Sequence, residues 1–202
     1  HFNANHADTV LLIARYAADP KPRGLRHALA AEPNPDYMFR PDFNAGLARL
    51  APAGLRFDLL LVPHLLGRAP RVVDAHPQQI FILDHFAKPF IARRELEPWA
   101  KELRVLAERP NVYAKVSGLV TEADPARWSA SDLRPYLDLA LEAFTPRRLL
   151  FGSDWPMCLF ATSYAGWLET LETWASALSP DERARLFGAT AVEAYGLATA
   201  PA

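Results

Sequence analysis

The chain has 202 residues, of which 50% are hydrophobic and 22% are charged, and its formal net charge at pH 7 is −1. This is the composition of an ordinary globular protein, and the length suits one domain spanning residues 1–202. The balance of 22 basic and 23 acidic residues gives no electrostatic reason to expect nucleic acid or an anionic membrane surface as a partner. The chain has one cysteine, which excludes an internal disulfide, and no apolar run approaches the roughly 20 residues of a membrane-spanning helix.

Helical and strand-like patterns alternate along the chain. We predict five strands, at 25–29, 57–62, 79–85, 111–116 and 149–154. The predicted helices are one that ends at the Asp19-Pro20 pair, one that begins at Pro41, one at 65–76, one that begins at Pro98, one from about residue 132, and two at 164–177 and 179–188. Loops are predicted at 32–36 and, unusually long, at 119–130. Each strand is followed by a helix, which predicts an α/β fold with a parallel sheet and helical crossovers.

The strand at 149–154 ends in a carboxylate. Its apolar run, Leu149 to Phe151, is typical of a buried parallel strand. Pro156 has no N–H to give a sheet, so we expect the strand to end close to Asp154. The carboxyl ends of parallel strands are where α/β proteins place their chemistry, so Asp154 is a candidate catalytic acid. The alternative is that it caps the next helix or pairs with an arginine.

His85 ends the strand at 79–85 in the same way, so we expect it at the same edge of the sheet as Asp154. A carboxylate close to an imidazole can hold a divalent metal or an attacking water, with the carboxylate as general base. The alternative for His85 is a core histidine that is hydrogen-bonded to a neighbour.

Four further residues are candidate substrate ligands. Arg26 and His27 end the first strand and could bind a substrate carboxylate or hydroxyl, or form a structural ion pair instead. Lys115 lies in an apolar strand, where a buried lysine is costly unless it is paired. It either meets a carboxylate at the edge of the sheet or points outward between helices. Trp155, beside Asp154, would give a pocket an apolar wall.

Four motifs together resemble one family. Phe151-Gly152-Ser153-Asp154-Trp155-Pro156, Leu83-Asp84-His85-Phe86-Ala87-Lys88-Pro89, Arg23-Gly24-Leu25-Arg26-His27 and Val112-Tyr113-Ala114-Lys115-Val116-Ser117-Gly118-Leu119 are similar to strand motifs of the amidohydrolase superfamily, in the branch that contains sugar-acid lactonases and related decarboxylases. The motifs occur in the family's order between Asp8 and Leu197. The resemblance implies a (β/α)8 TIM barrel of the metal-dependent hydrolase type.

The resemblance also implies a reaction. The chain would open a small polar lactone, of the sugar-acid 1,4-lactone type, with water that Asp154 deprotonates. His85 would hold the water or the carbonyl oxygen, and Arg26 and His27 would orient the substrate. A divalent metal, zinc or manganese, would be held by His1, His85 and Asp154. Some lactonases of the branch work without a metal, so the dependence on one stays open. We expect a cytoplasmic enzyme with a small-molecule substrate.

The number of strands falls short of this family. A barrel of this type has eight strands and typically ~250 residues, whereas five strands are found here. His1-Phe2-Asn3 resembles the end of the family's first-strand His-x-His motif, and a second strand is missing near residues 18–22. Either segments of a longer protein are absent from this sequence, or the protein is naturally truncated. A truncated chain would have open sheet edges and a tendency to form homo-oligomers.

Two other functions compete with the lactonase. One is a metal-dependent decarboxylase of the same branch, which would need its metal absolutely. The other is a non-catalytic barrel fragment that serves as a binding or assembly module. The loops at 32–39 and 119–130 would select the substrate, but they contain no recognisable motif that indicates which sugar acid is used.

Overall fold

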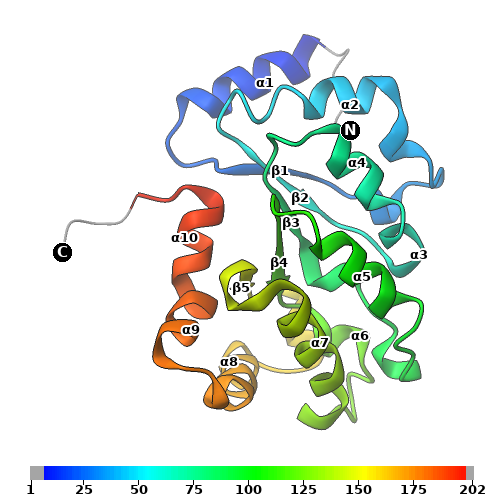
Figure 1. Cartoon of the computed structure of the whole chain (residues 1–202), viewed down its shortest axis with the longest axis vertical. Helices are drawn as coiled ribbons and strands as arrows, with labels where there is room; N and C mark the ends of the chain where they lie inside the picture. The colour runs from blue at the N-terminus through cyan, green and yellow to red at the C-terminus, as the bar shows by residue number, and fades with distance from the viewer. Residues whose placement is uncertain (1–6, 199–202) are drawn as a thin grey trace.

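The structure, a computed structural model that describes residues 7–198, is built on a five-stranded parallel sheet (Figure 1). Its strands lie side by side in chain order, and each pairs only with its neighbours in the sequence of strands. The strands are β1 (Gly24–His27), β2 (Arg56–Leu59), β3 (Phe81–Leu83), β4 (Val112–Val116) and β5 (Leu149–Phe151).

Helices connect the strands and extend the chain at both ends. They are α1 (Ala7–Ala18), α2 (Pro41–Leu47), α3 (Pro63–Leu66), α4 (Ala69–Ala75), α5 (Trp99–Ala107), α6 (Leu119–Glu122), α7 (Ala130–Arg148), α8 (Tyr164–Trp174), α9 (Pro180–Ala184) and α10 (Thr190–Tyr195). Short 3-10 segments cover Leu29–Ala31, Tyr37–Phe39, Asp84–Ala87, Ile91–Arg93, Met157–Phe160 and Ala175–Ala177, and a π turn covers Arg185–Ala189.

One face of the sheet carries the main hydrophobic core. Alternate strand residues point to this face, because successive side chains of a strand lie on opposite sides. Phe57 and Phe81 are fully buried here, and with Phe43 of α2 they form edge-to-face contacts at centroid distances of 5.8 and 6.3 Å. Leu103 of α5 and Leu137 of α7 close the same core.

The opposite face, which we call the inner face, packs against α10. Ile82, Tyr113 and Leu150 form a second, smaller apolar cluster with Ala194 of α10. Arg56 on β2 donates a hydrogen bond of 2.6 Å from Nε to the carbonyl oxygen of Ala194. The chain's C-terminal helix is therefore held against the inner side of the sheet.

The predicted α/β fold is confirmed with all five strands, but β1, β2, β3 and β5 end two or three residues before their predicted ends. Singly wound strands in chain order are the arrangement of a (β/α) barrel, but the sheet is open, since β1 and β5 are its edges among the described residues. The predicted helix at 65–76 was wrong in one respect: it is divided into α3 and α4, because Pro70 in the first turn of α4 has no N–H to continue a helix from α3. The long loop at 119–130 contains α6.

Within the described residues, no helix combines the length and the apolar character that crossing a membrane requires.

Arg148, the last residue of α7, joins three elements through backbone carbonyls. Its half-buried guanidinium donates to the carbonyl oxygens of Ala107, the last residue of α5, and Arg109, at 2.8 and 3.1 Å, and to that of Val112 in β4 at 3.0 Å. The bond to Ala107 satisfies a carbonyl at the C-terminus of α5, and the Arg109 carbonyl also accepts from the backbone N–H of Val112 at 3.1 Å.

We therefore expect Arg148→Met to lower the free energy of unfolding by about 3 kcal/mol, because charge-assisted hydrogen bonds are lost and buried carbonyls lose their donor. Urea denaturation measures this loss. Arg147→Met, which changes the exposed neighbouring arginine, is the control and should stay within about 0.5 kcal/mol of the wild type. Equal stability of the two variants would contradict the role of Arg148.

Candidate active site

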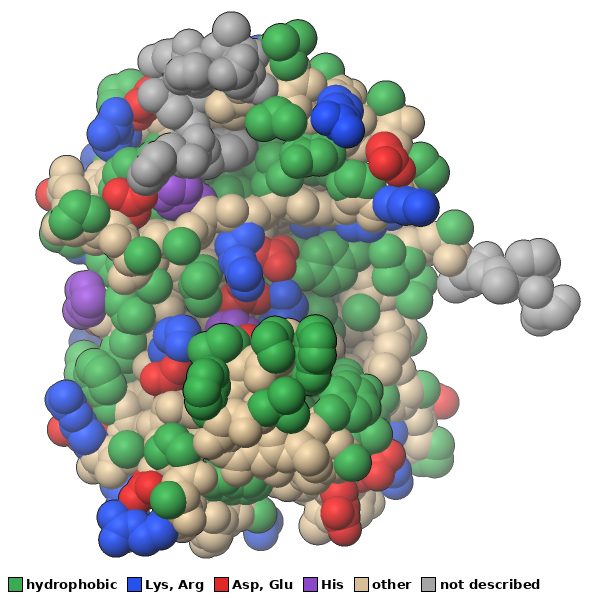
Figure 2. Space-filling model, turned by 180° about the vertical axis from the view of Figure 1, so that it is seen from behind, with side chains coloured by type: hydrophobic (Ala, Val, Ile, Leu, Met, Phe, Trp, Pro, Cys, Tyr) green, Lys and Arg blue, Asp and Glu red, His purple; other side chains and the backbone are tan. Residues whose placement is uncertain are grey.

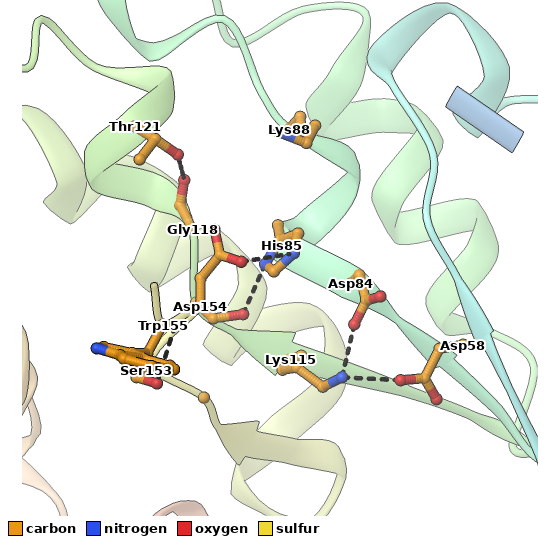
Figure 3. A network of polar contacts seen from close by, with 12 residues as sticks. Asp58, Asp84, His85, Lys88, Lys115, Gly118, Thr121, Ser153, Asp154 and Trp155 are labelled. Carbon is orange, nitrogen blue, oxygen red and sulfur yellow. Dashed lines mark hydrogen bonds and ion pairs between the residues drawn. The ribbon is translucent and has the colours of Figure 1, made fainter. Parts of the chain in front are cut away.

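Two strand ends bring His85 and Asp154 together. His85 follows β3 and Asp154 follows β5, and Nε2 of the imidazole lies 3.4 Å from Oδ1 of the carboxylate. Figure 3 shows the two side chains facing one another across the carboxyl edge of the sheet. Both side chains are largely buried, with 7% and 17% of their surface exposed. They line a pocket of about 440 Å³, so the sequence prediction that they share one edge of the sheet agrees with their position.

His85 reaches the pocket because the backbone after β3 adopts the left-handed conformation. Four consecutive residues, from His85 to Lys88, have φ values of 54°, 49°, 59° and 57°. The left-handed conformation costs an L-residue roughly 1–2 kcal/mol, so a run of four must be imposed by its surroundings. The segment Asp84–Ala87 is thus a strained turn at the end of a buried strand.

Burial and hydrogen bonds hold this turn. Phe86 and Ala87 are fully buried, and the indole N–H of Trp99 on α5 donates to the carbonyl oxygen of Phe86 at 2.7 Å. The backbone N–H of Lys88 donates to the carbonyl oxygen of His85 at 2.8 Å. The turn that carries the imidazole is therefore held from the core side by its burial and by the hydrogen bond from α5.

Asp154 has a left-handed backbone as well, with φ of 56°. The preceding Gly152 lies so close to β4 that a Cβ atom there would meet Lys115 Cγ at 3.0 Å and Ser117 Cβ at 3.2 Å. The indole N–H of Trp167 on α8 donates to the carbonyl oxygen of Gly152 at 2.8 Å. Close contact on one side and this hydrogen bond on the other fix the chain just before the carboxylate.

A buried hydroxyl contacts the other nitrogen of the imidazole. Oγ of Ser117, at the end of β4, lies 2.8 Å from Nδ1 of His85. Burial lowers the pKa of His85 below its usual value, an effect that the nearby carboxylates of Asp84 and Asp154 oppose only in part. The imidazole is therefore held neutral near pH 7.

A charged network lies on the inner face next to this pair. Lys115 on β4 donates to Asp58 at 2.9 Å and to Asp84 at 2.6 Å, as Figure 3 shows. Burial would lower the pKa of Lys115, but the two carboxylates raise it above its usual range, so the ammonium stays charged. Asp58 also accepts from the hydroxyl of Tyr195 on α10, and the fully buried Asp84 accepts from Arg26 on β1 at 3.3 Å.

The pocket has a charged side and an apolar side. Lys88 and Glu122 form an ion pair of 2.6 Å at the pocket wall. The complete lining consists of Arg26, Leu60, His85, Lys88, Thr121, Glu122, Pro125, Asp154, Met157 and Phe160.

The predicted substrate ligands lie in different places. Arg26 lines the pocket. His27 points to the opposite face of β1, where Nε2 lies 2.5 Å from Glu32 and the ring stacks on Tyr37 at 4.8 Å. Lys115 lies beneath the pocket in the network with Asp58 and Asp84, and the exposed Trp155 ring points away from His85 in Figure 3. The structure thus brings Arg26 to the predicted pair, but it does not bring His27 or Trp155 there.

The metal prediction concerns His1, His85 and Asp154, and His1 lies outside the described residues. Between residues 7 and 198, no three His, Cys, Asp or Glu side chains are arranged to hold a metal ion. A catalytic zinc takes three protein ligands, and His85 with Asp154 supplies two. The described residues alone therefore do not fit a complete zinc or manganese site.

Three residues at or near the site were not predicted to act there. They are Ser117, Asp58 and Glu122, of which Glu122 lies in the predicted loop at 119–130, where the sequence carries no recognisable motif. Asp58 had a signal that could have been used, because a carboxylate in a buried strand needs a cation and Lys115 is a cation in another buried strand.

The network makes a prediction about stability. Lys115→Met would leave Asp58 and Asp84 without their shared cation, so we expect the free energy of unfolding to fall by about 3–5 kcal/mol. Adding Asp58→Asn to this variant should restore part of the loss, since it removes one of the unpaired charges. Urea denaturation of the single and double variants measures the coupling, with the exposed Lys101→Met as control. A Lys115→Met variant as stable as this control would contradict the network's role.

The chain is similar in sequence to two proteins named as lactonases. The chain is 42% identical to an L-fucono-1,5-lactonase of Burkholderia multivorans, over 88% of the chain and 64% of the relative. It is 35% identical to an L-fucono-1,5-lactonase of Burkholderia ambifaria, over 91% of the chain and 64% of the relative. The chain therefore spans a little less than two thirds of the length of these relatives.

Two crystal structures of an amidohydrolase from Burkholderia multivorans share the fold. One, with bound HEPES, has a TM-score of 0.90 and 38% identity, and the match covers 96% of this chain and 71% of the crystallised one. The other, with bound zinc, has a TM-score of 0.87 and 40% identity, covering 93% and 69%. The open sheet is thus the matching part of a longer barrel in these proteins.

The amidohydrolase family model matches residues 3–197, which is nearly the whole chain. With the two lactonases as relatives, this match identifies the chain as a member of the amidohydrolase family.

Proposed function

We propose that the chain carries the hydrolytic site of a sugar-acid lactonase. The observation that supports this most directly is the contact between Asp154 and His85, at 3.4 Å, inside a pocket that also holds cationic side chains. A general base, a hydrogen-bond donor and fixed positive charge are the groups that ester hydrolysis by water needs. The names of the relatives, L-fucono-1,5-lactonases, support the same reaction class.

Asp154 acts as the general base. Its carboxylate accepts a proton from a water molecule while the water oxygen attacks the carbonyl carbon of the lactone. The neutral His85 donates a hydrogen bond from Nε2–H, which orients the water or the carbonyl oxygen. Arg26 and Lys88, at the same pocket, place positive charge near the oxyanion that forms on the former carbonyl oxygen.

The ring then opens. The oxyanion returns its electrons to the carbonyl, the bond between the acyl carbon and the ring oxygen breaks, and the leaving ring oxygen takes the proton that Asp154 had accepted. The products balance as one lactone and one water giving one hydroxy acid, and Asp154 is again a carboxylate.

The apolar side of the pocket suits a substrate with an apolar edge. Met157 and Phe160 line it although 49% and 73% of their surfaces are exposed. In Figure 2 a cluster of hydrophobic side chains lies beside a hollow that contains charged and histidine side chains. A 6-deoxy sugar acid has a methyl group where other sugar acids have a hydroxymethyl group, and burying this methyl against Met157 and Phe160 would favour it. We therefore propose a 6-deoxy aldonolactone as substrate.

The first test removes the base. Asp154→Asn should lower kcat about 10²- to 10⁴-fold for whichever aldonolactone the wild type opens, because the amide cannot take the proton from water. Ring opening is followed by the acid it releases, for a panel of 1,4- and 1,5-lactones. The control is Asp74→Asn, which neutralises an exposed carboxylate that pairs with Arg109.

The outcomes separate the lactonase from its rivals. Full activity of the Asp154→Asn variant would contradict the proposed mechanism. Metal-dependent release of CO₂ from an aromatic acid, without any lactone opening, would point to the decarboxylase. No turnover of either substrate class would favour a binding or assembly module.

The second test concerns the apolar wall. We expect the wild type to have a kcat/KM about 10-fold higher for L-fuconolactone than for L-galactonolactone, which differs by one hydroxyl group. Met157→Gln, which keeps the size of the side chain and makes it polar, should reduce this ratio. Leu159→Gln changes an exposed residue of the same segment that does not line the pocket, so it should leave the ratio unchanged. Equal ratios in the wild type and the Met157 variant would refute the role of the wall.

A further inference from the structure

Ser117 carries a buried hydroxyl group that takes no part in the reaction steps proposed above. It follows β4 on the same face as Lys115, and none of its surface is exposed. Its Oγ lies 2.8 Å from Nδ1 of His85, on the side of the imidazole that faces away from Asp154. The hydroxyl therefore contacts the site through the imidazole and does not line the pocket itself.

The surroundings of the ring decide which nitrogen carries the hydrogen. Nε2 of His85 faces Oδ1 of Asp154 at 3.4 Å. A lone pair on Nε2 would be repelled by the carboxylate, whereas an N–H is attracted to it, so the neutral ring carries its hydrogen on Nε2. Nδ1 then has a lone pair that needs a donor, and the Ser117 hydroxyl, which can donate, supplies it.

The residue after Ser117 fixes the plane of the ring. Gly118 has φ of 69°, a conformation that favours glycine, and a Cβ atom there would lie 2.7 Å from Nδ1 and 2.8 Å from Cγ of His85. The imidazole therefore lies directly against bare backbone. Ser117 and Gly118 together hold the imidazole: the hydroxyl sets its tautomer, and the absence of a side chain at Gly118 leaves room for the ring.

We propose that Ser117 is a positioning residue that donates a hydrogen bond to Nδ1 of His85 and thereby keeps Nε2–H directed at the pocket. The catalytic consequence of this bond rests on the proposed lactonase function, because there Nε2–H orients the water or the carbonyl oxygen. The hydrogen bond and the tautomer do not depend on which substrate the site takes.

Nitrogen NMR of histidine-labelled protein tests the tautomer without any substrate. The His85 signals are assigned by their loss in a His85→Gln variant. In the wild type near neutral pH we expect Nδ1 at the shift of an unprotonated ring nitrogen and Nε2 at that of a protonated one. In Ser117→Ala the two shifts should move toward each other as the tautomers mix. Thr190→Val removes another fully buried hydroxyl, which bonds the Pro146 carbonyl at 3.2 Å outside the pocket, and it should leave the His85 signals in place.

A protonated Nδ1 in the wild type would overturn the proposal, and so would His85 signals that are identical in the wild type and in Ser117→Ala. If Ser117→Ala does not fold, the wild-type spectrum still decides between the two tautomers.

Kinetics separate the positioning role from a purely structural one. Ser117→Ala should lower kcat about 10- to 100-fold with little change in KM, because the substrate still binds while the imidazole is misplaced for part of the time. Full kcat in a folded Ser117→Ala protein would remove the positioning role and leave the lactonase proposal intact. A wild type that opens no lactone, but has the expected NMR spectrum, would remove the lactonase proposal and leave the hydrogen bond established.

Discussion

The arrangement on the inner face of the sheet depends on one buried cation. Lys115 can lie there because the carboxylates of Asp58 on β2 and Asp84 after β3 neutralise it, and it is the one cation that both carboxylates share. The ion pairs tie β2 and β4 to the segment after β3, and Tyr195 extends the connection to α10 through Asp58. Since Asp84 immediately precedes His85, the same charge also fixes the start of the turn that carries the imidazole.

The candidate catalytic pair is placed by backbone conformations that most residues avoid. His85 and Asp154 both have positive φ, and neither is a glycine. Such positions persist where the surroundings determine them more strongly than the local cost opposes them. Here the surroundings are the fully buried Phe86, the indole of Trp99 and the close approach of Gly152 to β4. The rigid core behind the sheet therefore supports the precise geometry at its edge.

Much of the fold could be predicted from the sequence, because buried parallel strands are continuous apolar runs and prolines mark where they end. The nearness of His85 and Asp154 followed from one rule, that parallel strands present their carboxyl ends at one edge. The rule does not say which face of the sheet a side chain points to, because successive residues of a strand point to opposite faces. In the four-residue strand β1 no alternation of apolar and polar residues showed that Arg26 and His27 would differ in this way. Ser117 could not have been found in this way, since its role depends on the direction of a neighbouring imidazole. Trp155 resembles a pocket wall in sequence, yet the chain turns its ring outward.

The left-handed turn from His85 to Lys88 has a consequence for how this protein could change over generations. Glycine accepts positive φ freely, so replacing the half-buried Lys88 by glycine would relieve local strain, whereas at the fully buried Phe86 the packing that is lost would outweigh this gain. A glycine at Lys88 would also remove the ammonium that pairs with Glu122 at the pocket. Selection for heat resistance alone would thus favour a substitution that removes a charge from the proposed active site.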